Sequence, residues 1–82
     1  MVEILFDEKF KKYFSKIKDN LLKTKIIKQL EKLKDNPSFG KPMRNVRKGT
    51  RELYIKPFRL SYAYLSNENK IIILNLYHKN FQ

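Results

Sequence analysis

The arginines of this chain are unevenly placed, because all four lie between positions 44 and 59 while the lysines are spread over the whole length. The guanidinium group is a planar fork of donors that binds phosphate oxygens two at a time. The cationic residues of this segment are Arg44, Arg47, Lys48, Arg51, Lys56 and Arg59. We interpret them as a phosphate-contacting surface; the alternative is that a lysine-rich chain placed its few arginines by chance.

The single histidine, His78, follows Tyr77 near the end of the sequence. Histidine exchanges a proton near neutral pH more readily than other side chains. Cleavage of RNA by attack of a 2′-OH on its own phosphate needs a base, an acid for the leaving oxygen, and cations for the developing charge; it needs no metal. His78, Tyr77 or Lys56 fit the proton-transfer roles, and Arg59 fits the cationic role. A lone histidine is also a common incidental surface residue.

Charge dominates the composition: the 82 residues include 19 basic and 8 acidic side chains, for a net charge of +11. Self-repulsion on this scale favours an anionic partner, either nucleic acid or an acidic protein. A membrane surface is the weakest candidate, because the charge does not lie opposite one clean apolar helical face. With no cysteine and one histidine, we expect neither disulfide, metal nor cofactor.

The sequence also bears on the compartment. Its longest wholly apolar run, residues 71–74, is too short to span a bilayer. The opening residues lack the basic leader of a secretory signal. We therefore expect a cytoplasmic protein.

The first half of the chain predicts one strand and two helices. Residues 2–6 are apolar and partly β-branched, which indicates a strand. Asp7 can cap a helix that carries Phe10, Phe14 and Ile17 on one face. Asp19 and Asn20 offer a second cap, and the helix that follows should end before Pro37. Its apolar stripe consists of Leu22, Ile26, Leu30 and Leu33. Because few residues join the helices, they should form an antiparallel αα-hairpin.

The second half predicts strands. Residues 37–42 have loop composition. Alternating polarity indicates strands at 51–56, 58–65 and 70–77, with a hairpin loop at 66–69. The order β-α-α-β-β-β predicts a single α+β domain over residues 1–82. The N-terminal strand and the αα-hairpin should pack on one face of a small, mostly antiparallel sheet.

The predicted sheet has a second face that the helices would leave open. If Leu53, Ile55, Leu60 and Tyr62 point toward the helices, alternation places the polar set on the other side. That set comprises Glu52, Tyr54, Lys56, Arg59 and Ser61. Cations for the backbone and rings for unstacked bases suit single-stranded RNA. The alternative is an ordinary solvated face, of the kind antiparallel sheets often have.

Several segments in this order resemble the RelE/ParE toxin superfamily over essentially the whole chain. They are Gly40-Lys41-Pro42, the strand Arg51 to Lys56, the strand Phe58 to Tyr62 with its Arg-Leu-x-Tyr pattern, and the closing run Ile72 to Lys79. The resemblance implies a bacterial or archaeal toxin that enters the ribosomal A site and cuts mRNA there without a metal. Its expected partners are mRNA, ribosomal RNA and an acidic, partly disordered antitoxin of the RelB type.

The resemblance also implies roles for individual residues. Arg59 matches the strand arginine that stabilises the phosphate, and Lys56 matches a cation of the preceding strand, where Tyr54 replaces another. The pair Tyr77-His78 is similar to the C-terminal end of YoeB-like toxins, in which such a histidine takes part in proton transfer. Lys79 stands where RelE-like toxins usually have an arginine.

Further contacts and other functions remain open at the level of sequence. Phe81 can stack on a base, and the arginine-rich segment with Tyr54 is expected to contact RNA or the ribosome. The ParE branch of the same superfamily poisons DNA gyrase instead. Because that branch generally lacks the terminal catalytic set, His78, Lys56 and Arg59 favour RNA cleavage. A small RNA-binding domain without catalysis is a third possibility.

Overall fold

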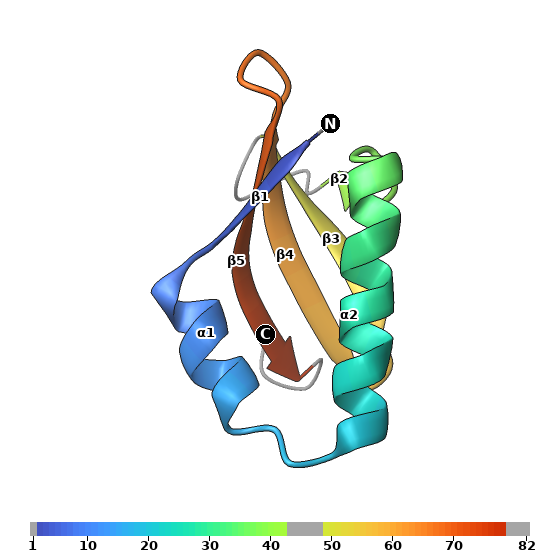
Figure 1. Cartoon of the computed structure of the whole chain (residues 1–82). Helices are drawn as coiled ribbons and strands as arrows, with labels where there is room; N and C mark the ends of the chain where they lie inside the picture. The colour runs from blue at the N-terminus through green and yellow to red at the C-terminus, as the bar shows by residue number, and fades with distance from the viewer. Residues whose placement is uncertain (1, 43–48, 79–82) are drawn as a thin grey trace.

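The computed structural model describes residues 2–42 and 49–78 (Figure 1). Its elements, in chain order, are β1 (Glu3–Phe6), α1 (Glu8–Ser15), α2 (Asn20–Asp35), β2 (Lys41–Pro42), β3 (Thr50–Ile55), β4 (Phe58–Leu65) and β5 (Lys70–His78). This confirms the predicted α+β class and the predicted order of helices and long strands. The short strand β2 was not predicted, because its two residues lie in a segment rich in turn-forming residues.

The strands of the described part of the chain form one five-stranded sheet in the order β1-β5-β4-β3-β2. β1 runs parallel to β5, and every other pair of neighbours is antiparallel. The parallel pair needs a long connection, which here runs through both helices and then β2, β3 and β4. The predicted mostly antiparallel sheet is therefore confirmed.

Both helices begin at the predicted aspartates. The carboxylate of Asp7 accepts a hydrogen bond from the Lys9 N–H at 2.9 Å, and that of Asp19 accepts from the N–H groups of Leu21 and Leu22 at 2.9 and 3.3 Å. Each cap satisfies backbone donors that the first helical turn leaves free. α1 ends at Ser15, so Ile17 lies beyond the helix, although its side chain is buried as expected.

The helices run in opposite directions on one face of the sheet and stand apart from each other (Figure 1). α1 lies close to β5. The core lies between this helical layer and the sheet, and it includes Phe10, Ile17, Ile26, Leu33, Leu53, Ile55, Leu60, Tyr62, Ile71, Ile73 and Leu76. The inward orientation predicted for alternate residues of β3 and β4 is confirmed by the burial of Leu53, Ile55, Leu60 and Tyr62.

A β-bulge changes the phase of β5. Ser61 pairs with Asn75, but the next residue, Tyr62, pairs with Ile73, so Leu74 has no partner in this register. The extra residue turns the side chains that follow it by one position. Inward-facing Ile73 is therefore followed by inward-facing Leu76, which is also buried.

Candidate functional site

The open face of the sheet brings residues from three strands side by side. Arg59 of β4 pairs with Tyr54 of β3 on one side and with Tyr77 of β5 on the other. Residues that pair directly across strands project to the same face. Because Leu53 and Leu60 are buried on the helical side, Arg59 and both tyrosines project to the opposite side. The predicted placement of Tyr54 and Arg59 on one open face is thus confirmed.

Glu52 joins two of these groups. Its Oε1 lies 3.1 Å from Arg59 Nη1, and its Oε2 accepts a hydrogen bond from the Tyr77 hydroxyl. The carboxyl-bearing side chain is 19% exposed, and that of Arg59 is 36% exposed. Partial burial strengthens such charge-assisted hydrogen bonds relative to those in open solvent. We call Glu52, Arg59 and Tyr77 the carboxylate cluster.

The carboxylate cluster joins a cation, an acceptor and a hydroxyl in direct contact. The sequence indicates Arg59 and Tyr77 as candidate site residues but gives no role to Glu52. The alternation of β3 did place Glu52 on the open face. The sequence does not reveal the register, in which Glu52 pairs with Ser61, two residues from Arg59 on β4 and within reach of β5.

His78 lies on the other side of the sheet. It pairs with Phe58, and the two rings meet edge to face with centroids 5.6 Å apart. Phe58 in turn meets Tyr13 of α1 at 5.8 Å. The bulge in β5 explains this arrangement, since it turns Tyr77 toward Arg59 and His78 toward the helices. The structure therefore does not bring His78 together with Arg59 on one face.

Other predicted site residues are also placed differently from the expectation. Lys56 is exposed in the turn that joins β3 to β4, because β3 ends one residue earlier than predicted. Ser61 was expected on the accessible open face, but it is only 5% exposed, between strands on both sides. The remaining predicted residues Arg44, Arg47, Lys48, Lys79 and Phe81 lie outside the described part of the chain.

Arg51 fastens the segment before β2 rather than projecting freely. Its Nη1 donates to the carbonyl oxygens of Gly40 at 2.7 Å and Ser38 at 3.2 Å. Tyr62 acts on the same segment, because its hydroxyl accepts from the Gly40 N–H and donates to the Pro37 carbonyl, each at 2.8 Å. Burial raises the pKa of Tyr62 above 10.0, against the lowering effects of the Gly40 hydrogen bond and the Arg51 charge.

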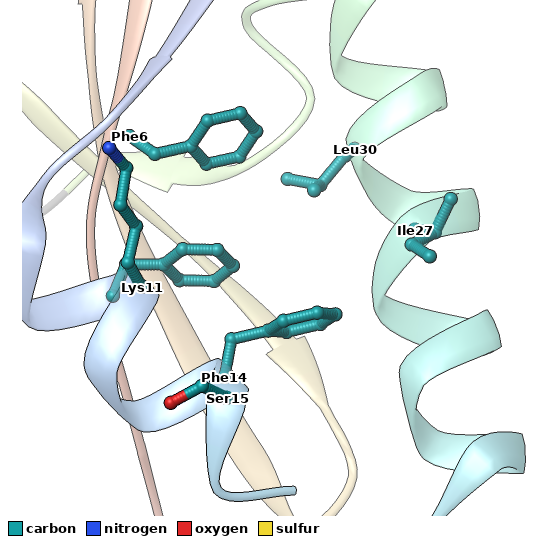
Figure 2. A pocket seen from close by; sticks show the side chains of 7 residues that line it. Phe6, Lys11, Phe14, Ser15, Ile27 and Leu30 are labelled. Atoms are coloured by element: carbon teal, nitrogen blue, oxygen red, sulfur yellow. The ribbon is translucent and has the colours of Figure 1, made fainter.

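The helical side carries an apolar groove between α1 and α2. Figure 2 shows Phe6 and the rings of α1 facing Ile27 and Leu30 of α2 across it. The groove has a volume of about 310 Å³, and Lys11 and Ser15 complete its lining. Phe6 and Ile27 remain 41% and 48% exposed. We call this the interhelical groove.

The rings beside the interhelical groove form a short stack. Phe10 meets Phe6 and Phe14 with centroids 5.5 Å apart in each case. At the Phe14 end, Lys23 of α2 places its ammonium 5.7 Å from the ring centroid. The ammonium groups of Lys11 and Lys23 therefore lie beside the apolar side chains of the interhelical groove.

The described residues hold no grouped metal ligands and no helix suited to crossing a membrane. Within 2–42 and 49–78, no three histidine, cysteine, aspartate or glutamate side chains gather as metal ligands would. No helix in those ranges is both long and apolar enough to cross a membrane.

The fold is shared with solved toxins. A chain of the intact E. coli RelBE toxin–antitoxin complex superposes with a TM-score of 0.82 at 16% identity, over 95% of this chain and 96% of that one. The RelBE2 toxin–antitoxin complex of Mycobacterium tuberculosis gives 0.80 at 22% identity, over 95% and 98%. The YoeB dimer of Staphylococcus aureus gives 0.79 at 19% identity, over 94% and 95%.

A match to a sequence family agrees with this fold. Curated protein sequences give no match. Residues 4–81, in contrast, match the family described as the ParE toxin of the type II toxin–antitoxin system parDE. Because this match covers nearly all of the sequence, the chain belongs to the ParE toxin family, within the ParE/RelE superfamily of type II toxin–antitoxin toxins.

Proposed function

We propose that this toxin is an endoribonuclease that cuts mRNA in the ribosomal A site and acts in the cytoplasm. The observation that carries the proposal is the carboxylate cluster, in which Glu52 contacts both Arg59 and the Tyr77 hydroxyl. A cation, a proton acceptor and a proton donor in contact are the groups that 2′-OH attack on a phosphate requires.

The residues of the carboxylate cluster can carry out RNA cleavage and return to their starting protonation states. Glu52 accepts the proton of the 2′-OH as its oxygen forms a bond to phosphorus. Tyr77 donates its hydroxyl proton to the 5′ oxygen as the phosphorus–oxygen bond to that atom breaks. The proton then passes from Glu52 to the Tyr77 phenolate along their hydrogen bond, and both groups regain their starting forms. The products are a 2′,3′-cyclic phosphate and a 5′-hydroxyl end.

Arg59 serves the phosphate in this scheme. Its guanidinium contacts one oxygen of Glu52 through Nη1, and a guanidinium has donors enough to bind a phosphate oxygen as well. The ion pair aims the guanidinium at the cluster before RNA arrives. Charge that develops on the phosphate during attack is then stabilised without reorganisation of the side chain.

Other cationic and proton-carrying residues complete the proposal. Lys56, exposed in the turn after β3, can contact a neighbouring phosphate. The resemblance gives proton transfer to His78 instead, with Lys79 as a further cation. Since His78 packs on the helical side, RNA would have to pass around the end of β5 to reach both His78 and Arg59.

An induction experiment tests the proposal in cells. Expression of the toxin should stop translation first, and primer extension should map truncated messages to cuts inside codons. Arg59→Ala should remove the cuts, and Leu21→Ala, a change at a highly exposed position of α2, should keep them.

Gyrase poisoning is the second candidate, favoured by the match to the ParE toxin family. It predicts intact messages, trapped gyrase–DNA complexes and a primary DNA-damage response in the same induction experiment. A toxin that binds RNA without cutting it would instead stop translation and leave every message intact.

We also propose that the partner is an acidic antitoxin whose amphipathic helix occupies the interhelical groove. The groove offers apolar side chains from α1 and α2 that remain partly exposed. Lys11 and Lys23 border it, so acidic residues beside an apolar stripe would complement it. Two of the solved relatives described above are toxin–antitoxin complexes, which supports a partner of this kind.

A further inference from the structure

A cleft of about 500 Å³ lies at the edge of the open face, beside the carboxylate cluster. Side chains from α2, from the segment before β2 and from β2, β3 and β4 line it. The lining residues that matter here are Gln29, Phe39, Lys41, Glu52, Tyr54 and Arg59. Its volume falls within the roughly 300–1,000 Å³ of small-ligand sites.

Two aromatic side chains in this cleft are unusually exposed. Phe39 is 46% exposed and Tyr54 is 54% exposed, although both are large and largely apolar. They come from positions fifteen residues apart in sequence and meet at one cleft. Exposed rings that line one concave place can stack on a flat ligand.

Cations accompany the rings. Lys41 is exposed in β2, and Arg59 contributes to the cleft from its place in the carboxylate cluster. On the α2 side, the Lys32 ammonium lies 5.8 Å from the centroid of the Phe39 ring. A nucleotide combines a flat base with an anionic phosphate, and it matches rings and cations placed together.

We propose that this cleft binds one base of single-stranded RNA, next to the phosphate that Arg59 holds. The proposal rests on the proposed endoribonuclease function and adds a base subsite to it. The base contacts the rings of both Tyr54 and Phe39, and its phosphate meets Arg59 and Lys41. Gln29 places an amide at the cleft, and an amide both donates and accepts hydrogen bonds at a base edge.

The subsite is held in place before RNA arrives. Tyr62 and Arg51 fasten Pro37, Ser38 and Gly40 through their carbonyl and N–H groups, so the residues on both sides of Phe39 are tied to the sheet. Tyr54 belongs to β3 and is paired with β4. Two rings on fixed backbone lose little freedom when a base binds, which favours affinity.

Binding of a short RNA that cannot be cut tests the subsite. The probe is a fluorescent RNA tetranucleotide with a 2′-O-methyl group at every position, which removes the attacking hydroxyl. It is compared with the same probe lacking one base. Removal of the base that occupies the cleft should weaken wild-type binding about tenfold, within the range for one stacked base. Phe39→Ala and Tyr54→Ala should each weaken binding of the intact probe by a similar factor, whereas Leu21→Ala should not.

The decisive comparison is the effect of removing the base from the probe, measured with wild type and with a double variant. If the base sits in the cleft, its removal should have almost no further effect on the double variant Phe39→Ala/Tyr54→Ala, because the contact is already lost. Equal losses in wild type and double variant, at every abasic position, would overturn the proposal. Gln29→Ala should change the preference among the four bases if the amide reads the base edge.

Cleavage by wild-type toxin separates this inference from the proposed function. A toxin that cuts no message but shows the coupling would have the base subsite without the endoribonuclease activity. A toxin that cuts messages but lacks the coupling would have the activity without the subsite.

Discussion

On the open face, Glu52 is the residue that contacts both Arg59 and Tyr77. In the sequence it is one polar position of an alternating strand, and nothing in that strand distinguishes it from a solvated carboxylate. In the structure its two oxygens divide between Arg59 and Tyr77, which come from two further strands. Contacts that depend on the register of three strands cannot be derived from the alternation of any one of them.

Substitutions in the carboxylate cluster should separate the two proton-transfer assignments. Glu52→Gln and Tyr77→Phe should each lower the single-turnover cleavage rate by about 10²–10⁴, because each removes a proton carrier while keeping the side chain's size. His78→Ala should leave that rate within a few-fold of wild type, since His78 lies on the helical side. A loss of about 10²–10⁴ in His78→Ala alone would return proton transfer to the histidine.

Tyr62 gives a prediction about stability and pH. Tyr62→Phe should cost about 1–3 kcal/mol in the free energy of unfolding near pH 8, because the Gly40 N–H and the Pro37 carbonyl lose their partner. Burial raises the pKa of Tyr62 in the folded state. The stabilisation by its neutral hydroxyl is therefore complete below the unfolded pKa of about 10 and is lost as the pH rises above it.

Denaturant unfolding of both proteins between pH 8 and pH 11 measures the effect. The stability difference between wild type and Tyr62→Phe should shrink above pH 10. A difference that stays constant or grows over this range would contradict the burial of the hydroxyl as the cause.

At the scale of elements, the sequence predicts what depends on local pattern. The caps Asp7 and Asp19, the end of α2 before Pro37, and the alternation of β3 and β4 are local signals, and the structure confirms them. The bulge in β5 and the edge strand β2 depend on the register of pairing with a neighbouring strand, which the sequence does not reveal. That is why Tyr77 and His78 could be found as candidates but not assigned to faces.

Gly40 tests how tightly β2 and the segment before it are held. A Cβ at this position would lie 2.8 Å from the Tyr62 ring and hydroxyl and 2.9 Å from the Glu52 carbonyl oxygen. Gly40→Ala should therefore lower the free energy of unfolding by about 1–3 kcal/mol. Thermal unfolding measures this effect. Ser66→Ala, a change in the exposed β4–β5 loop, is the control variant. Equal melting temperatures for wild type and Gly40→Ala would show that this segment moves aside easily.

The whole molecule has two different sides. The carboxylate cluster and the proposed base subsite lie on the open side of the sheet or at its edge. The interhelical groove lies on the helical side (Figure 2). The net charge of +11 would attract either proposed partner, RNA or an acidic antitoxin, from a distance, so charge alone does not distinguish the two. The apolar lining of the interhelical groove does distinguish them, because it suits the apolar side of an antitoxin helix and not RNA.

Antitoxin binding and RNA cleavage should therefore be separable by mutation. Ile27→Asp adds an acidic charge to a half-exposed position of the interhelical groove and should weaken antitoxin affinity at least tenfold. Leu21→Asp makes the same change in charge at a more exposed position of α2 and should leave affinity nearly unchanged. Titration of each purified toxin with its antitoxin measures this. Equal affinities for wild type and Ile27→Asp would place the antitoxin elsewhere.

Single-turnover cleavage of ribosome-bound mRNA, with ribosomes in saturating excess, is the most direct test of the proposed activity. Wild-type toxin should cut the message within the A-site codon and leave a 2′,3′-cyclic phosphate. Arg59→Ala should bind the ribosome with similar affinity but cut about 10²–10³ times more slowly, because the donor to the transition-state phosphate is gone. Messages that stay intact with wild-type toxin, or an Arg59→Ala variant that cuts at the wild-type rate, would contradict the account.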